Sequence, residues 1–352
     1  MAVSLDRVFI TGRIAANKKL LKSLNLNAAV KKVFLNAGYG RSHPGTVWLP
    51  EPDGIVVDTS GRIVVDTSGL ILDEIQEDER AIRCLSDDQS ITVGYAVDSP
   101  ETNYIPRGQW LAWQVMREIR MLTAEKPGCF GPDAKVLTQI AGGEDGWTFD
   151  RLVVSMQHAA AIDWSEIGRI AYRALKILKK RFEETGTACN FDPDAVDLIV
   201  NGHGDFSTGG PMGDNGLSGK KLVMDAYGPM VAIGGGAYSG KDPHKVDRAG
   251  AVLAREMALY SVINESNPWD TIQLSWAPGK QHYVAMNSSM AMDCARQQFP
   301  QTIQQCVNRY FRKPIRNSFT EFALKGWYSG ALKAPWEKLV PDRGLTVHED
   351  FA

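Results

Sequence analysis

This sequence of 352 residues lacks both long apolar runs and an excess of charge of one sign. No apolar stretch approaches the roughly 18 residues of a membrane helix. The first residues, Met-Ala-Val-Ser-Leu-Asp-Arg, have neither the basic nor the apolar segment of a signal peptide. The 39 Lys and Arg nearly balance the 41 Asp and Glu, so no nucleic acid and no membrane surface is expected as a partner. We therefore expect a cytoplasmic protein.

Cysteine and histidine are also scarce. The five cysteines are odd in number, widely spread and without a CxxC pair, which argues against a zinc site or dithiol chemistry and predicts reduced thiols. The six histidines show no metal-ligand spacing. With 44% hydrophobic residues the chain can bury a core, and its length allows two or three domains.

Two features precede residue 85. Residues 15–34 combine apolar residues at helical spacing with lysines, which predicts a basic amphipathic helix. We interpret its basic face as a solvated surface in preference to a membrane or nucleic-acid site. Residues 56–61 recur as residues 64–69, VVDTSG in both copies, and turn residues between β-branched runs predict a β-hairpin.

Beyond residue 90 the sequence predicts alternating strands and helices, and hence a mixed α/β fold. Asp163 and Glu166 have the spacing of a capping box, and apolar residues then recur at helical spacing from Ile167 to Phe182. Residues 195–200 and 221–225 are predicted strands. Asp242-Pro243 is typical of a helix start.

Glycine and charge are concentrated between residues 201 and 248. About a third of the chain's 33 glycines lie there, interleaved with five aspartates and five basic residues. Glycine lets backbone N–H groups approach a ligand, lysine neutralises phosphate oxygens, and a carboxylate can hold magnesium. We interpret the segment as a polyphosphate site, and the alternative is a set of tight loops with surface charges.

The segment also comes close to a P-loop. Residues 235–241 fit the pattern GxxxxGK, but Asp242 stands where Ser or Thr would bind magnesium. A P-loop follows a buried strand, whereas only a short apolar stretch after a proline precedes these glycines. We therefore do not favour a P-loop NTPase.

Two long motifs in this segment closely resemble the signature of the methionine adenosyltransferases, also called S-adenosylmethionine synthetases. They are GGPMGDNGLSGKK at residues 209–221, running on to DAYG at 225–228, and GGGAYSGKD at 234–242, followed by KVDR at 245–248. Shorter matches are DQ at 88–89 with GY at 94–95, PDAK at 132–135, SMQH at 155–158, QLSWA at 273–277 and PWEK at 335–338. The resemblance covers residues 85 to 340.

The resemblance implies a fold, an assembly and a reaction. The fold is α/β (α+β), with three similar βαβ-type domains related by pseudo-threefold symmetry. The assembly is a homodimer or a dimer of dimers with active sites between subunits. The substrates are ATP and L-methionine: the methionine sulfur attacks ribose C5′, tripolyphosphate leaves, and the enzyme hydrolyses it to pyrophosphate and phosphate. Mg²⁺ and K⁺ are the implied cofactors.

The resemblance also assigns roles to single residues. Five lysines match phosphate-contacting, catalytic positions: Lys135, Lys220, Lys221, Lys241 and Lys245. Substrate positions are matched by Asp88, Asp133, Phe206, Asp214 and Ala237. Among these, Asp88 and Asp214 would hold the methionine ammonium and Phe206 would stack on adenine. Asp247 matches a magnesium ligand. Lysine ammonium groups and magnesium would stabilise the leaving tripolyphosphate, because it gathers about four negative charges.

Some family features are missing. The N-terminal GHPDK motif, with a histidine for the leaving oxygen and an aspartate for a second magnesium, has no counterpart before residue 85. His43-Pro44 is followed by Gly45-Thr46, and we interpret it as a coincidence. Asp205 stands where the family has an arginine, and Ile233 replaces a histidine. His203 is a candidate nucleotide contact, whereas His158, His244 and His282 are expected to be structural or surface residues.

Three functions therefore stay open. The leading hypothesis is an active, divergent methionine adenosyltransferase. The second is a catalytically impaired member that binds nucleotide or regulates a true synthetase. The third keeps the phosphate site for triphosphate hydrolysis or for adenosyl transfer to another nucleophile. By sequence we divide the chain into a divergent N-terminal region (1–84), a first matched part (85–200) and a glycine-rich segment with a C-terminal domain (201–352), and we expect the true domains to be discontinuous.

Overall fold

The computed structural model describes residues 2–4, 7–16, 18–30, 48–51, 54–57, 61–62, 64–74, 84–126, 128–143, 146–237, 241, 244–290 and 298–310. The chain divides into two units, each made of two stretches: residues 1–74 with 111–217, and residues 75–110 with 218–352. The boundaries of these units differ from those of the ranges 1–84, 85–200 and 201–352 that the sequence suggests. The division into three domains stays a prediction. None of the described helices is long and apolar enough to cross a membrane.

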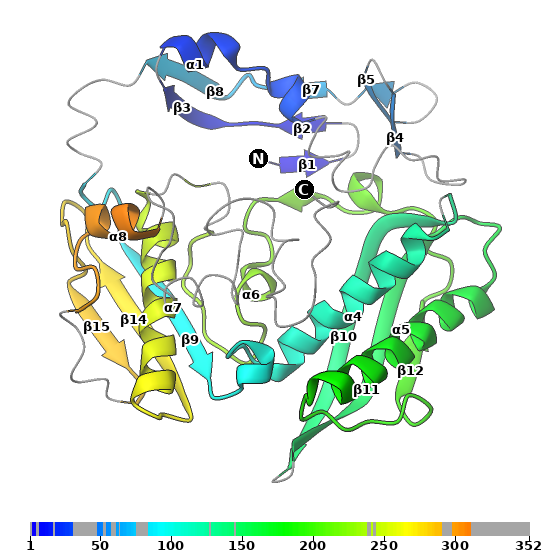
Figure 1. Ribbon diagram of the computed structural model, residues 1–352. Coiled ribbons are helices and arrows are strands. Elements are labelled where there is room, and N and C mark those ends of the chain that lie inside the picture. The colour runs from blue at the N-terminus through cyan, green and yellow to red at the C-terminus, as the bar shows by residue number, and fades with distance from the viewer. Residues whose placement is uncertain are drawn as a thin grey trace. The chain divides into compact units, whose positions relative to one another are not determined.

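The first unit contains a three-stranded sheet covered by helices. Strands β10 (Phe130–Gly143) and β11 (Gly146–His158) are antiparallel, and β12 (Asp197–Val200) runs parallel to β11. Helix α5 (Trp164–Thr185) connects β11 to β12, so these elements form a βαβ unit. In Figure 1, α5 and α4 (Arg107–Ala124) lie on the same side of this sheet.

Helix α5 has the boundaries and the buried stripe that the sequence predicts. Asp163 Oδ1 accepts a hydrogen bond from the Ser165 N–H at 2.7 Å, and Gly186 ends the helix with φ of 67°. The expected apolar residues from Ile167 to Phe182 are all buried. The second half of the capping box is absent, because the Glu166 carboxylate pairs with Lys126 and Arg169 instead.

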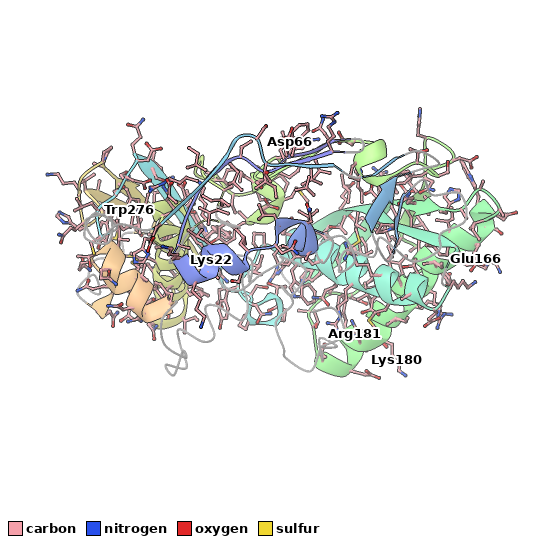
Figure 2. All side chains as sticks on the ribbon, turned by 90° about the horizontal axis from the view of Figure 1, so that it is seen from above. Lys22, Asp66, Glu166, Lys180, Arg181 and Trp276 are labelled. Carbon is pink, nitrogen blue, oxygen red and sulfur yellow. The ribbon has the colours of Figure 1, made fainter. Side chains whose placement is uncertain are left out.

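Lys180 and Arg181 are neighbours on α5 with different environments (Figure 2). The Lys180 side chain is 77% exposed and lies 3.8 Å from Glu184, a pair that contributes little to stability. The Arg181 guanidinium donates to Glu118 of α4 at 2.6 Å, and only 2% of the Glu118 side chain is exposed. This buried ion pair fixes α5 against α4, and loss of either partner would leave an uncompensated charge.

Short strands from the N-terminal stretch complete the first unit. One sheet has the order β13-β1-β2-β7, formed by Gly216–Leu217, Ala2–Ser4, Arg7–Phe9 and Val64–Asp66. Strands β3 (Gly12–Ala16) and β8 (Leu70–Glu74) are parallel, and β4 (Trp48–Glu51), β5 (Gly54–Val57) and β6 (Gly61–Arg62) are antiparallel. The predicted hairpin is confirmed at β5–β6, whereas the second copy of the repeat pairs with β2.

The prediction of one helix over residues 15–34 is wrong. Strand β3 runs through Ala16, and α1 occupies only Lys18–Ser23. A second helical stretch is described over residues 26–30, after Asn25, whose Oδ1 accepts from the Ala28 N–H at 3.0 Å. An asparagine in this position caps a new helix, which divides the periodic pattern in two. Residues 31–34 lie outside the described part of the chain.

The second unit is a three-stranded antiparallel sheet with helix α7 on one face. The sheet order is β15 (Ala285–Ser288), β14 (Trp269–Trp276) and β9 (Ser90–Val97), and α7 spans Val246–Asn264. Helix α8 (Ile303–Tyr310) packs on α7, and short helices η1 (Pro100–Thr102) and α6 (Leu222–Asp225) follow β9 and the glycine-rich loop. The buried residues of α7, β14 and α8 form its hydrophobic core.

Two local predictions in this unit need correction. Residues 221–225 form no strand: the N–H groups of Met224 and Asp225 both donate to the Lys221 carbonyl at 2.9 Å, which makes α6 a helical turn. A short apolar run does not distinguish the two structures. Helix α7 begins at Val246 with Lys245 in the cap position, later than Asp242-Pro243, which lie outside the described residues.

The close approach of α7 to β9 depends on Gly94. A Cβ at residue 94 would lie 2.0 Å from the Ala254 carbonyl carbon and 2.2 Å from the Arg255 amide nitrogen. Both are backbone atoms inside a helix and cannot move aside alone. A side chain at this position would therefore separate the helix from the sheet.

We predict that Gly94→Ala destabilises the protein by about 3 kcal/mol or more, because it forces α7 away from β9. The matched control is Gly168→Ala in α5, where a Cβ meets nothing within 4 Å. That substitution should stabilise by about 0.5–1 kcal/mol through helix propensity. Urea unfolding followed by circular dichroism measures both, and equal midpoints would contradict the packing argument.

Candidate active site

The carboxylate of Asp247 is held from two sides at the first turn of α7. Ser90, the first residue of β9, donates from Oγ to Asp247 Oδ1 at 2.5 Å. The Lys241 ammonium contacts Asp247 Oδ2, also at 2.5 Å. Contacts with Ser90, 157 positions away in the sequence, and with Lys241 fix the orientation of this carboxylate.

Glycine is required where the loop before α7 crosses β9. A Cβ at residue 234 would lie 1.8 Å from the Ile91 carbonyl oxygen. A Cβ at residue 236 would lie 2.1 Å from Asp247 Cγ. The GGG run therefore brings backbone against the strand and against the carboxylate, a close approach that side chains would prevent.

The second lysine of this cluster, Lys245, also faces a carboxylate. Its ammonium donates to Asp87 Oδ2, and both side chains are about half exposed. Arg248 donates to the Lys241 carbonyl. Asp88 is exposed, and its Oδ1 accepts from the Gln89 N–H at 2.8 Å. The structure thus places Lys241, Lys245 and Asp247 near the first turn of α7, and their roles with phosphate and magnesium stay predictions.

Lys220 and Lys221 lie on an exposed turn with Ala237 beside it. Gly219 has φ of +77°, and a Cβ there would lie 2.8 Å from the Ala237 Cβ. The turn needs glycine for its backbone angle and for this contact. Asp225, four residues on, is half-buried, and this burial raises the pKa of its carboxyl group.

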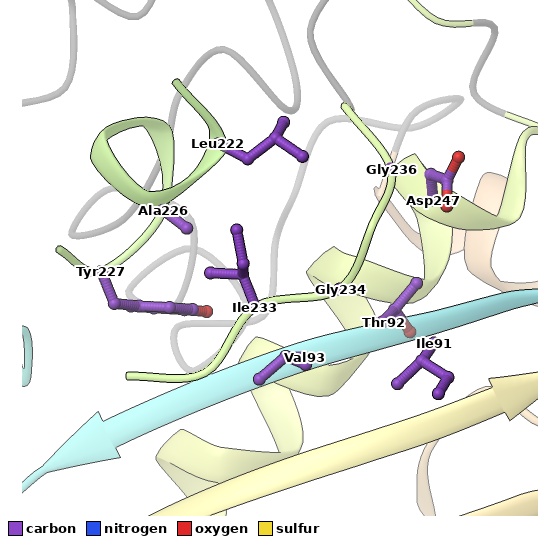
Figure 3. Close-up of a pocket in the computed structure, with 10 residues that line it drawn as sticks. All are labelled: Ile91, Thr92, Val93, Leu222, Ala226, Tyr227, Ile233, Gly234, Gly236 and Asp247. Atoms are coloured by element: carbon purple, nitrogen blue, oxygen red, sulfur yellow. The ribbon is translucent and has the colours of Figure 1, made fainter. Parts of the chain in front are cut away.

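A pocket opens between these elements (Figure 3). Asp247 and Gly236 lie at one end, and Tyr227 and Ile233 lie at the other. Its walls are mostly apolar, and the polar side chains that line it are those of Thr92, Tyr227 and Asp247. Ile233, where the resemblance expects a histidine, packs on the hydrophobic core, so it brings no titratable group to the pocket.

Asp133 and Gln157 organise the glycine-rich loop of the first unit. Asp133 Oδ2 accepts from the Gly210 N–H at 3.1 Å, and Gln157 Nε2 donates to the Ser207 carbonyl at 3.1 Å. A Cβ at residue 209 would lie 2.7 Å from Gln157 Cδ. Asp133 therefore acts here as a structural acceptor for the loop.

Phe206 is positioned by the buried His158. The two backbones pair, with the His158 N–H donating to the Phe206 carbonyl at 3.0 Å. The Phe206 N–H donates to His158 Nε2 at 3.2 Å, so Nδ1, 2.9 Å from the Ala159 carbonyl, carries the ring proton. The structural role predicted for His158 is confirmed. Asp205 is exposed and accepts from Trp164 Nε1 at 3.4 Å, while His203 is exposed.

The remaining predicted residues of the first unit are exposed. Lys135 lies on β10 opposite Ser155 of β11, and Asp214 follows the turn of η2 (Gly210–Met212). Asp133, Lys135, Phe206 and Asp214 belong to the first unit, and the other predicted site residues belong to the second. His43 and residues 335–338 lie outside the described residues.

Sequence reasoning missed Ser90 and Asp87. Both lie within two residues of Asp88, which the resemblance singles out, but no motif indicates that Ser90 contacts Asp247 or that Asp87 contacts Lys245. Such contacts join residues more than 150 positions apart and depend on the tertiary fold.

The donor set at Asp247 suits a hard cation. Carboxylate and hydroxyl oxygens are ligands that Mg²⁺ accepts, and it usually takes one or two carboxylates together with phosphate oxygens. The Lys241 ammonium shows that Asp247 Oδ2 accepts a positive charge. A Cβ at residue 236 would lie 2.1 Å from Asp247 Cγ, so glycine leaves room for the carboxylate itself. Among the described residues no group of three or more His, Cys, Asp and Glu could hold a metal ion by itself.

Comparisons with known proteins agree on one family. The model of the S-adenosylmethionine synthetase C-terminal domain matches residues 208–334. The S-adenosylmethionine synthase of Corynebacterium jeikeium is 31% identical over 79% of this chain and 70% of its own length. That of Mycoplasma genitalium is 30% identical over 71% of this chain and 66% of its own. The solved structure of an unusual S-adenosylmethionine synthetase from Campylobacter jejuni has a TM-score of 0.71 and 23% identity, and covers 96% of this chain and 86% of that one.

The sequence matches place this chain in the synthetase class, and its fold agrees with them. The chain belongs to the S-adenosylmethionine synthetase family. The mixed α/β fold expected from the resemblance is confirmed.

We predict that Gly236→Ala weakens binding of Mn²⁺, as a probe for Mg²⁺, and of tripolyphosphate by about tenfold or more, because the new methyl group displaces the Asp247 carboxylate. Gly235→Ala is the matched control, since a Cβ there meets nothing within 4 Å. Calorimetry measures both affinities. Equal losses of affinity in the two variants would show that the glycines are needed for the backbone conformation and not for the position of the Asp247 carboxylate.

Proposed function

We propose that this protein is a methionine adenosyltransferase, which forms S-adenosylmethionine from ATP and L-methionine and hydrolyses the released tripolyphosphate. The observation that carries the proposal is the cluster of Lys241, Lys245 and Asp247 at the start of α7, inside the segment that the family model matches. The relatives are S-adenosylmethionine synthases, and the activity of this chain is inferred from the cluster and from family membership.

The proposed chemistry needs positive charge where the triphosphate leaves. When the C5′–O bond breaks, negative charge develops on the α-phosphate oxygen, and preorganised ammonium groups stabilise it. Lys135, Lys220, Lys221, Lys241 and Lys245 are proposed to bind the phosphates. Asp247 would hold Mg²⁺, and a bound Mg²⁺ neutralises phosphate charge as a Lewis acid. K⁺ is proposed as a second cation from family membership alone.

The two other substrate parts are assigned to separate groups. Phe206, with its backbone fixed by His158, would present a ring face to adenine. Asp88 and Asp214, both exposed, would accept hydrogen bonds from the methionine ammonium. We also propose that the loops containing Asp133 and Ala237 line the nucleotide site.

The missing GHPDK motif favours electrostatic over acid–base catalysis. Without that histidine, stabilisation of the leaving group rests on the lysines and on the cation at Asp247. A lost general acid typically costs about 10²–10⁴ in rate. The competing functions are a nucleotide-binding or regulatory protein without activity, and a triphosphate hydrolase on the same scaffold.

We predict that purified protein with ATP, methionine, Mg²⁺ and K⁺ yields S-adenosylmethionine detectable by mass spectrometry. Lys241→Ala should lower kcat/KM by about 10²-fold or more, because it removes a charge that stabilises the leaving group. His43→Ala should change it little. Nucleotide binding without product would favour the regulatory protein, and phosphate release without methionine would favour the hydrolase.

We also propose a homodimer, because an apolar row crosses the open face of the first unit's sheet. Leu137 pairs with Val153 and Val153 with Ile199, and Leu137 and Ile199 are 58% and 40% exposed. Lys135, two residues before Leu137 on the same strand face, would then lie at the subunit boundary. A second copy is the proposed occupant, since closed twofold dimers are the commonest assembly and family membership favours one.

We predict a dimer by light scattering at micromolar concentration, and conversion to monomer by Leu137→Glu, because a buried unpaired carboxylate opposes association. Leu72→Glu on β8, at a position 47% exposed, is the control and should leave the dimer intact. A wild-type monomer with full activity would contradict the proposal.

A further inference from the structure

Two lysines of the second unit, Lys241 and Lys245, already pair with carboxylates. Lys241 contacts Asp247 and Lys245 contacts Asp87, so the two ammonium groups face acids and not open solvent alone. Polyphosphate can use these ammonium groups fully only if the acids release them. The site therefore has a resting set of ion pairs that ligands must exchange.

The two oxygens of Asp247 are engaged by different kinds of donor. Oδ1 accepts from the neutral Ser90 hydroxyl, which remains compatible with a cation on the other oxygen. Oδ2 carries the Lys241 ammonium, which a divalent cation on that oxygen would repel. Both side chains of the Lys241–Asp247 pair keep some exposure, 35% and 21%, so the pair can separate at small cost.

We propose that Lys241 is a built-in cation that occupies Asp247 Oδ2 until a divalent metal replaces it, which frees its ammonium for polyphosphate. Ser90 is the positioning residue that keeps the Asp247 carboxylate in place during the exchange. This inference rests on the proposed function, because it takes Asp247 as the metal carboxylate and Lys241 as a phosphate-binding lysine. It adds a coupling between the two ligands: metal binding and polyphosphate binding favour each other through one lysine.

The exchange predicts that removal of one lysine raises the affinity for a metal ion. Lys241→Met removes the competing ammonium and should raise the affinity for Mn²⁺ alone by about threefold or more, as expected for loss of a partly exposed ion pair. The same variant should bind tripolyphosphate more weakly in metal-free buffer. Asp247→Asn should do the opposite: it abolishes this Mn²⁺ site, and it strengthens metal-free tripolyphosphate binding because Lys241 is released.

Two readouts measure these effects in the full-length protein. Electron paramagnetic resonance of free Mn²⁺ gives the metal affinity, and calorimetry in the presence of a chelator gives the tripolyphosphate affinity. Lys180→Met is the matched control: it removes the same charge from an exposed lysine–glutamate pair on α5 and should change neither affinity. Thermal melting confirms that each variant is folded.

Ser90 has its own test. Ser90→Ala should weaken Mn²⁺ binding by about tenfold, because a hydrogen bond to a charged carboxylate is lost. Ser90→Thr keeps the hydroxyl and should restore the affinity. Equal affinities in both variants would remove Ser90 from the proposal.

The outcomes separate the exchange from the proposed function. If Asp247→Asn abolishes Mn²⁺ binding but Lys241→Met leaves it unchanged or weaker, the exchange is wrong and the metal role of Asp247 stands. If Asp247→Asn has no effect on Mn²⁺ affinity, both the exchange and that metal role are wrong. Opposite changes of the two affinities in Lys241→Met, with Lys180→Met unchanged, support the exchange.

Discussion

The packing of α7 on β9 is the constraint on which the second unit depends. Gly94 on the strand and Gly250 on the helix remove the side chains that would separate them, and a Cβ at residue 250 would lie 2.7 Å from Trp276 Nε1. That indole donates to the Thr92 hydroxyl at 3.2 Å within the same contact. Because the helix lies this close, its first turn reaches the start of β9, where Asp247 meets Ser90. The carboxylate to which the proposed function assigns the metal is therefore placed by glycine packing along the helix.

The same helix also carries a buried cation. Arg255 is fully buried and donates to the carbonyls of Tyr104 at 3.1 Å and Asn103 at 2.8 Å, as well as to that of Tyr95. Burial lowers the pKa of its guanidinium to about 10, so it stays charged near neutral pH. Asn103 and Tyr104 have φ of 57° and 59°, a left-handed backbone that non-glycine residues rarely adopt. The carbonyls that this turn directs inward solvate Arg255, so the strained turn and the buried charge stabilise each other.

How much the sequence could predict follows from the range of the interactions involved. Helix α5 was predicted with its cap and its buried stripe, because Asp163 and the apolar period act within one segment. The strand expected at residues 221–225 is a helical turn, since its three apolar residues, Leu222, Val223 and Met224, fit either structure. The motifs single out the lysines and Asp247 as candidates. Their partners Ser90 and Asp87 are not singled out, because only the tertiary fold brings residues 90 and 247 together.

The mixture of acids and bases in the glycine-rich segment has a physical reason that a list of phosphate-binding residues would miss. Lys241, Lys245 and Arg248 are gathered at the N-terminus of α7, which itself carries a partial positive charge. Without a ligand, this concentration of positive charge would oppose folding. Asp87 and Asp247 compensate it in the ligand-free protein. In the proposed exchange, a polyphosphate replaces the carboxylates as the source of negative charge, and a metal on Asp247 replaces the lysine that the phosphate has taken. A site built from lysines alone would bind phosphate more tightly and fold less well, and it would leave the metal no carboxylate.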